Sequence, residues 1–169
     1  MRHPGVAFGP PVRVGRPTVS VIADGLVVGA YLVADDLAWL GREHRVTAIV
    51  CLQDHADLDA RGLDAAALCG ASSALGVAWH HVAVRDGDAS ALAARLPDIV
   101  RLITELVDRG ERVYLHCSAG FNRAPTAAIA YLHAARGMPL EDAIAFVAMR
   151  RSCEPYAEAL RSFAARIVP

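Results

Sequence analysis

The run Val46–Leu52 (VTAIVCL) constrains the fold more than any other part of this sequence. Its residues are almost wholly apolar and several are β-branched, which is the pattern of a strand covered by other elements on both faces. A strand of this kind belongs inside a sheet that packs against helices on each side. The run therefore favours an α/β domain.

Further strand and helix signals alternate along the chain. Short apolar runs predict strands over Thr18–Ile22, Leu26–Ala30, Val77–Val84 and Arg112–His116. Helical spacing and end signals predict helices over Asp35–Glu43, Leu96–Arg109, Pro125–Arg136, Leu140–Arg150 and Tyr156–Ile167. Residues 53–76 indicate only a loop with some helix. The alternation predicts a central, mostly parallel sheet of about four or five strands flanked by helices, which binds ligands at the carboxyl ends of its strands.

The 169 residues fit one domain, because a chain of this length buries most of its apolar surface around one core. We divide it into an irregular, Gly- and Pro-rich lead-in over residues 1–17 and a folded domain over residues 18–169. No export signal or membrane-spanning run is visible. We expect a single globular domain.

The net charge and the spacing of the cysteines limit the partners and compartments that we expect for this chain. The formal net charge of −1 provides no global field for nucleic acid or an anionic membrane, so we expect neither as a partner. The four cysteines are scattered and form no CxxC pair, which argues against a zinc site or a disulfide scaffold and for the reducing cytoplasm. We expect no metal and no cofactor, and leave the oligomeric state open.

The segment HCSAGFNRAPT at residues 116–126 carries the chemistry. A short strand ends, the chain turns, and a helix begins with a proline in its first turn. Such a loop directs several backbone N–H groups at one anion, aided by the helix dipole. Glycine lets the backbone curve close to that anion, and the guanidinium matches two phosphate oxygens. The predicted phosphate-binding residues are Ser118, Ala119, Gly120, Phe121, Asn122 and Arg123.

Cys117 opens this loop, so its sulfur is expected beneath the same anion. Helix N-termini and neighbouring cations favour the thiolate, which is the reactive form of cysteine. We expect Cys117 to attack phosphorus and form a phosphocysteine that water then hydrolyses. The alternative, a small core cysteine, leaves the glycine, arginine and helix that follow it unexplained.

Phosphoryl transfer also needs a proton donor for the departing oxygen. Arg85–Asp88 (RDGD) follows the strand ending at Val84 and should reach the same rim as the cysteine loop if the strands run parallel. Asp86 is the predicted general acid and Asp88 the second choice; the alternative for each is a solvated loop carboxylate. An ionised Cys117 working with a protonated Asp86 predicts a bell-shaped pH profile with a mildly acidic optimum.

These residues resemble the signature of the cysteine phosphatases, Cys-x5-Arg preceded by His. The order of DGLVVG, VTAIVCLQ, an Asp-bearing loop and the cysteine loop resembles that of dual-specificity phosphatases over about residues 18–167. The resemblance implies a dual-specificity-phosphatase-like fold, a protein tyrosine or dual-specificity phosphatase activity, and a phosphorylated substrate. It also supports Asp86, because the first aspartate of this segment is the general acid in the family.

Several motifs also resemble plant glucan (starch) phosphatases, namely IVCLQ-D at 49–54, RD-D-A with RLP at 85–97, CxAGxxRAP at 117–125 and RRSC-P at 150–155. Ala124 stands where dual-specificity enzymes usually have a Ser or Thr whose hydroxyl assists phosphocysteine breakdown. The aromatic residues that line the glucan cleft correspond here to Ala60, Arg61, Gly87 and Glu154. We therefore expect a phosphoprotein substrate, with a glucan, sugar or inositol phosphate as the alternative.

The resemblance also implies roles around the loop. Cys51 matches a family position whose cysteine can form a regulatory disulfide with the nucleophile; otherwise it is an apolar strand residue. His116 is expected to support the loop indirectly, and Ser118 and Asn122 to brace it. Phe121 is expected to lie toward the cleft wall.

Two pairs of adjacent residues outside the loop are expected to have structural rather than functional roles. His80 and His81 should face opposite sides of a strand and are read as structural rather than metal-binding. Arg150 and Arg151 are read as a solvated helix end.

Two other functions remain open at this point. A rhodanese-like sulfurtransferase also places a cysteine at the head of an anion-binding loop, but needs no counterpart of Asp86. A pseudophosphatase would bind phosphate without turnover, and Ala124 is compatible with slow turnover. Sulfur transfer from thiosulfate, or the absence of any hydrolysis, would distinguish them.

Overall fold

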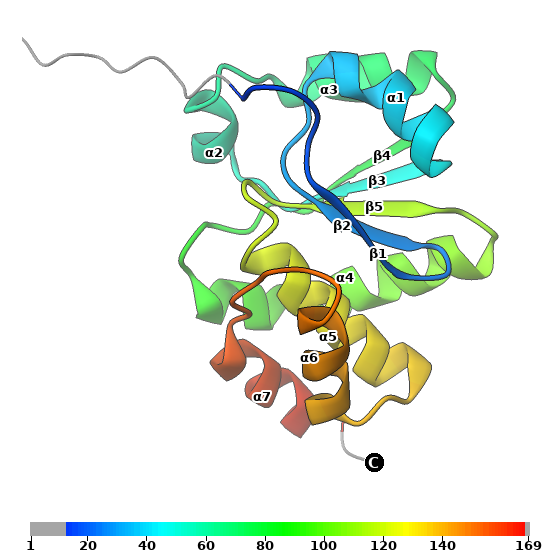
Figure 1. The fold of residues 1–169 in the computed structure, drawn as a ribbon. Coiled ribbons are helices and arrows are strands. Elements are labelled where there is room, and N and C mark those ends of the chain that lie inside the picture. The colour runs from blue at the N-terminus through cyan, green and yellow to red at the C-terminus, as the bar shows by residue number, and fades with distance from the viewer. Residues whose placement is uncertain (1–12, 168–169) are drawn as a thin grey trace, which may run out of the picture.

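The computed structural model describes residues 13–167, which form a five-stranded sheet with helices on both faces (Figure 1). The strands are β1 (Val19–Ala23), β2 (Leu26–Gly29), β3 (Ala48–Cys51), β4 (Ala78–His81) and β5 (Val113–His116). The helices are α1 (Ala34–His44), α2 (His55–Asp59), α3 (Ala65–Ala74), α4 (Ala89–Asp108), α5 (Arg123–Arg136), α6 (Leu140–Ala148) and α7 (Ala157–Arg166). The predicted α/β class is confirmed.

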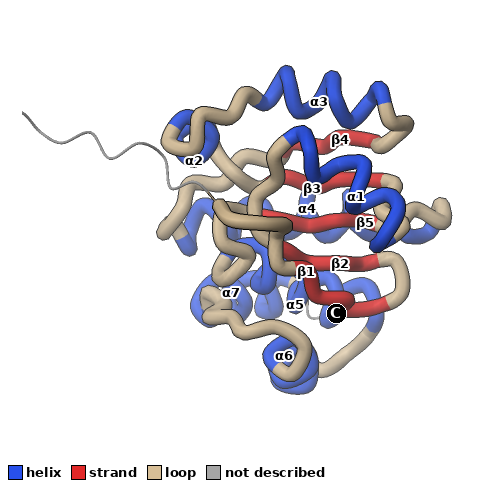
Figure 2. The backbone as a smooth tube through the Cα atoms, turned by 45° about the horizontal axis from the view of Figure 1, so that its top comes forward, coloured by secondary structure: helices blue, strands red, loops and turns tan. Residues whose placement is uncertain are grey.

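The sheet has the order β1-β2-β5-β3-β4, which Figure 2 shows from one edge to the other. β5 pairs in parallel with β2 and β3, and β4 pairs in parallel with β3, whereas β1 is antiparallel to β2. The residues of β2, β3 and β5 are all buried, as their continuous apolar pattern predicts. β5, which leads into the cysteine loop, is the central strand of the sheet.

Two groups of helices cover the sheet, as Figure 1 shows. α1 and α3 lie on one face, where Leu37 and Leu40 of α1 pack with Ile49 of β3 and Tyr114 of β5. α4, α5, α6 and α7 lie on the other face and form the larger core. Among residues 13–167, no helix combines the length and apolar character needed to cross a bilayer.

Two helices begin earlier than predicted. α4 begins at Ala89 rather than Leu96 because the Asp88 carboxylate accepts a hydrogen bond from Ala91 N at 2.8 Å and caps the helix. Pro97 lies inside α4 rather than at its start. α5 begins at Arg123, so the guanidinium that should bind phosphate belongs to the first turn of the helix.

The predicted lead-in over residues 1–17 lies mostly outside the described residues. Its described part carries no helix or strand. Arg13 and Arg16 both form ion pairs with Asp36, a carboxylate in the first turn of α1 that is 1% exposed. These ion pairs hold the end of the lead-in against α1.

Candidate active site

The cysteine loop joins the central strand to a buried helix. Cys117 follows β5 directly and is 2% exposed, and Arg123 opens α5 and is 1% exposed. The Asn122 side chain does not cap α5 but donates to the carbonyl of Glu154 at 2.8 Å. The N–H groups of the first turn therefore keep their hydrogen-bonding capacity for an anion.

Gly120 lets the loop pass close to β2. It has a φ of +65°, and a Cβ at this position would overlap the carbonyl oxygen of Gly29 and the guanidinium of Arg151. Ser118 is joined to the same region, since its carbonyl accepts from Tyr31 N at 2.9 Å. Only glycine meets both the conformational and the steric requirement at position 120.

Arg123 is held from two sides. Its Nη1 donates to Asp57 Oδ2 and to the carbonyl of Val84, each at 2.7 Å. Its Nε makes no hydrogen bond among the described residues and lies 3.3 Å from Asp86 Oδ1. Burial acts to lower the pKa of Arg123, but its hydrogen bond to Asp57 and the charges of Cys117 and Asp57 outweigh it and raise that pKa. The guanidinium is fixed as a cation beside Cys117.

Asp57 is a site residue that the sequence interpretation missed. It lies in the first turn of α2, where it forms reciprocal hydrogen bonds with the N-cap Asp54. Ser118 Oγ donates to Asp57 Oδ1 at 3.1 Å, and Gln53 Nε2 donates to Ser118 Oγ at 3.2 Å. The spacing Asp54-x-x-Asp57, which resembles a capping box, was the available signal for α2. It gave no sign that the second carboxylate reaches Arg123.

Arg151 corrects the interpretation of Arg150 and Arg151 as a solvated helix end. Arg150 is exposed, but Arg151 is 8% exposed and lies under the cysteine loop. Its guanidinium donates to the carbonyls of Gly120, Ala119 and Val28. Arg151 therefore braces the loop from below, and its interior position had no signal in the local sequence.

Asp86 and Asp88 have different positions. Asp86 has a 62% exposed side chain whose Oδ1 lies 3.3 Å from Arg123 Nε, on the rim where a leaving group would depart. Asp88, the second choice, serves instead as the N-cap of α4. Between them, Gly87 N donates to the hydroxyl of Tyr156 at 3.1 Å, which ties the loop to the start of α7. The geometry favours Asp86 as the proton donor.

Cys51 and His116 lie side by side on β3 and β5, where they are register partners. Cys51 is a free, buried thiol, and burial raises its pKa to about 12. His116 is buried, its Nδ1 lies 3.1 Å from the carbonyl of Cys117, and burial lowers its pKa to about 4. His116 is therefore neutral near pH 7, and its ring supports the backbone of Cys117.

Among the described residues, His80 and His81 have no set of metal ligands beside them. His81 Nε2 lies 2.6 Å from the carbonyl of Gln53, and the buried Nε2 of His80 has no partner among the described residues. Within residues 13–167 no group of three or more His, Cys, Asp or Glu side chains is arranged to hold a metal ion. Ala124 is fully buried in α5.

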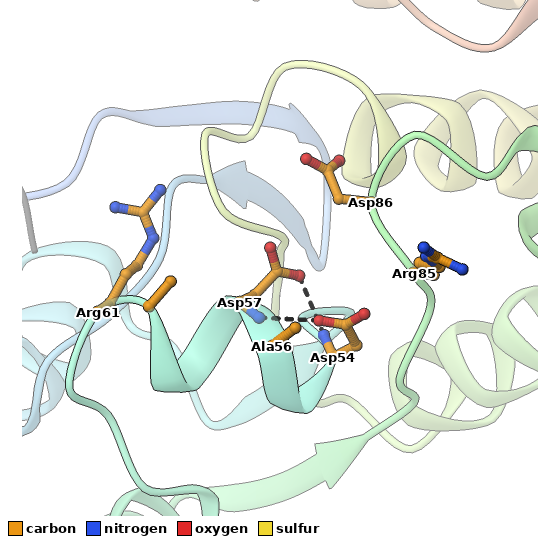
Figure 3. Close-up of a pocket in the computed structure, with 7 residues that line it drawn as sticks. Asp54, Ala56, Asp57, Arg61, Arg85 and Asp86 are labelled. Atoms are coloured by element: carbon orange, nitrogen blue, oxygen red, sulfur yellow. Dashed lines mark hydrogen bonds between the residues drawn. The ribbon is translucent and has the colours of Figure 1, made fainter. Parts of the chain in front are cut away.

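A pocket of about 440 Å³ opens beside the loop and is drawn in Figure 3. Its lining residues are Asp54, Ala56, Asp57, Ala60, Arg61, Arg85 and Asp86. Both carboxylates that approach Arg123 belong to this lining, so the pocket is continuous with the phosphate-binding region. Phe121 is 38% exposed and is not among the lining residues.

Residues 41–162 match the family model described as the dual specificity phosphatase catalytic domain. The chain belongs to this family. In the solved structure of Tk-PTP in its active form, the dual-specificity phosphatase fold of this chain recurs with a TM-score of 0.76 and 25% identity, over 88% of this chain and 97% of that one.

Curated relatives of this dual-specificity phosphatase domain include enzymes named for different substrates. Phosphoglucan phosphatase DSP4 of Castanea sativa is 33% identical over 87% of this chain and 40% of that protein. Dual specificity protein phosphatase 1 of Mus musculus is 31% identical over 44% of this chain and 20% of that protein. The chain spans less than half the length of either relative.

Proposed function

We propose that this chain hydrolyses phosphomonoesters through a phosphocysteine intermediate. The observation that carries the proposal is the convergence of Cys117, Arg123 and Asp86 at one rim, with Arg123 Nε left without a hydrogen bond among residues 13–167. A phosphate bound there would receive hydrogen bonds from Arg123 and from the backbone N–H groups of residues 118–123. The same groups stabilise the charge on the transferring phosphoryl group.

Two displacements complete the reaction. The Cys117 sulfur attacks phosphorus, the P–O bond to the leaving group breaks, and Asp86 donates its proton to the departing oxygen. Water then attacks the phosphocysteine, the S–P bond breaks, and Asp86 takes a proton from the water. Inorganic phosphate leaves, and Cys117 and Asp86 return to their starting protonation states.

A phosphorylated protein is the substrate class that we favour, and a phosphoglucan is the second candidate. The likeness to the Castanea sativa phosphoglucan phosphatase favours the glucan. Against it, the pocket beside the loop is lined by no aromatic side chain, and a neutral sugar chain generally needs such a flat apolar surface. A reducing compartment such as the cytoplasm suits the four free cysteines.

Hydrolysis of p-nitrophenyl phosphate by matched variants tests the proposal. Cys117→Ser should bind phosphate but lose turnover, and Asp86→Asn should lose rate by roughly 10²–10⁴-fold with poor leaving groups. Asp88→Asn is the matched control, because asparagine also caps helices well and Asp88 faces α4 rather than the site.

Three results would contradict the proposal. Full activity of Cys117→Ser would exclude the phosphocysteine. Loss of activity in Asp88→Asn but not in Asp86→Asn would reverse the assignment of the acid. Sulfur transfer from thiosulfate to cyanide without phosphate release would indicate a sulfurtransferase, and phosphate binding without turnover would indicate a pseudophosphatase.

A further inference from the structure

Arg61 has an unusual position at the wall of the pocket beside the cysteine loop. It follows α2, the helix that supplies Asp57 to Arg123, and Figure 3 shows it across the pocket from Asp86. The backbone N of Arg61 donates to the carbonyl of Leu58, but its side chain makes no hydrogen bond and no ion pair with any of the residues 13–167, although the guanidinium carries five donors. A cation is therefore available on the wall facing the general acid.

The Arg61 guanidinium is also held in place. Its Cζ lies 4.1 Å from the centroid of the Tyr31 ring, a cation–π contact that limits its freedom. Tyr31 is itself 8% exposed, and its backbone N donates to the carbonyl of Ser118 in the cysteine loop. The platform beneath Arg61 is thus attached to the phosphate-binding loop, which fixes the distance between the two sites.

The acidic residues of the pocket do not neutralise this cation. Asp57 accepts from Arg123, Ser118 and Asp54, so its charge is compensated inside the protein. Asp54 accepts from Asp57 N as the cap of α2. Asp86 lies against Arg123. The remaining charged side chain of the lining, Arg85, is exposed and adds a second cation.

We propose that Arg61 forms a second anion subsite, so that the preferred substrate carries another phosphate or carboxylate close to the phosphate that is hydrolysed. This inference rests on the proposed phosphatase activity and narrows its substrate class. The pocket volume of about 440 Å³ exceeds what one phosphate needs and lies in the range of small-ligand sites. The pocket lining offers guanidinium groups but no aromatic side chain on which a sugar ring could stack. It should therefore select an anionic group rather than a neutral glycan.

Matched substrates test the subsite. One arm compares a phosphotyrosine peptide with the same peptide bearing a second phosphoresidue, and with versions that place Ala or Lys there. The other arm compares a hexose bisphosphate with the hexose monophosphate. The two arms separate a protein source of the second anion from a small-molecule source. We expect kcat/KM to rise roughly tenfold with the second anion, the gain typical of one charge-assisted hydrogen bond.

Variants locate the effect. In Arg61→Ala this preference should disappear, and Arg61→Lys should restore part of it because the charge returns without the planar fork. Arg161→Ala, which removes an exposed arginine of α7 outside the lining, should keep the preference. Thermal unfolding of each variant would check its fold.

The outcomes separate the two proposals. If wild type hydrolyses p-nitrophenyl phosphate in a Cys117-dependent manner but shows no preference for the second anion, or prefers the Lys peptide, the subsite is wrong and the phosphatase stands. A preference that survives in Arg61→Ala also overturns the assignment. Absence of Cys117-dependent hydrolysis would instead overturn the phosphatase.

Discussion

Asp57 Oδ2 accepts a hydrogen bond from Arg123 Nη1 at 2.7 Å, which joins α2 to the first residue of α5. The side chain of Arg123 is 1% exposed and that of Asp57 13%, so the pair is largely removed from water. Burial acts to raise the pKa of Asp57, but the hydrogen bond and charge of Arg123 outweigh it and hold that pKa below its usual value. The arginine that should bind phosphate is therefore oriented by a carboxylate from a distant helix.

Asp57→Asn should reduce both stability and activity. It leaves the buried charge of Arg123 without compensation, and we expect the free energy of unfolding at pH 7 to fall by about 1–3 kcal/mol. Because the pKa of Asp57 is lower in the folded than in the unfolded chain, its contribution is present above about pH 4 and is lost as pH falls further. Urea unfolding should show a difference from wild type at pH 7 that shrinks at pH 3; equal stability at pH 7 would contradict the role.

His116 predicts a separate acid-sensitive range. Its folded pKa of about 4 lies below the usual value of 6.5 because the ring is buried, so the unfolded chain takes up the proton first. Stability should therefore fall by roughly 3 kcal/mol between about pH 6.5 and pH 4, with a smaller contribution of the same sign from His80, whose pKa is also lowered by burial. In His116→Gln this slope should flatten. An unchanged slope would show that His116 does not control it.

The sequence was sufficient for the parts of the site that are local. Cys117, Gly120 and Arg123 all lie within residues 117–123. The strand, the glycine and the helix that position them can each be predicted from the neighbouring sequence. The run Val46–Leu52 likewise marked β3 as a buried strand, since burial on both faces leaves a continuous apolar pattern.

The missed residues act over long separations. Asp57 is 66 residues from Arg123, and Arg151 is 31 residues from Gly120. Aspartate and arginine are mostly exposed in proteins, so their burial depends on tertiary partners that no periodicity reveals. Asp88 was predicted as an alternative general acid but caps α4 instead. A carboxylate in a loop after a strand is compatible with either role, and only the start of the helix decides between them.

Arg151 and Arg150 form a matched pair of adjacent residues. Arg151→Ala removes the donors to the carbonyls of Gly120, Ala119 and Val28, and should cost roughly 2–3 kcal/mol of stability because buried acceptors lose their partners. We also expect kcat/KM to fall, since the loop loses its brace. Arg150→Ala removes an exposed side chain that contacts Phe146 and should change neither by much. Similar losses in both variants would contradict the bracing role.

Cys51 predicts reversible oxidation of the enzyme. Peroxide would oxidise the Cys117 sulfur to a sulfenic acid, and the Cys51 thiol would then displace water to give a disulfide. Both thiols are free and buried, and Cys51 is the register partner of His116, which directly precedes Cys117. Because burial raises the pKa of Cys51 to about 12, it is protonated near neutral pH and must give up its proton as its sulfur attacks the sulfenic acid.

Peroxide treatment of wild type and Cys51→Ala measures this role. Wild type should recover activity with dithiothreitol, whereas Cys51→Ala should progress to irreversible sulfinic acid. Mass spectrometry of the inactivated wild type should find the Cys51–Cys117 linkage. Cys69→Ala, at a partly exposed cysteine in α3, is the control and should behave as wild type. Reversible inactivation without that linkage would refute the pairing.

Gly120→Ala and Gly137→Ala separate steric fit from backbone strain. Both glycines have positive φ, +65° and +68°, but a Cβ at Gly137 meets nothing within 4 Å, whereas at Gly120 it overlaps Gly29 and Arg151. Each variant should lose about 1–2 kcal/mol of stability from conformation alone. Only Gly120→Ala should also lose phosphate binding, because the loop must move away from β2 and its N–H groups then diverge. Normal phosphate inhibition of Gly120→Ala would show that close contact with β2 is not needed to shape the loop.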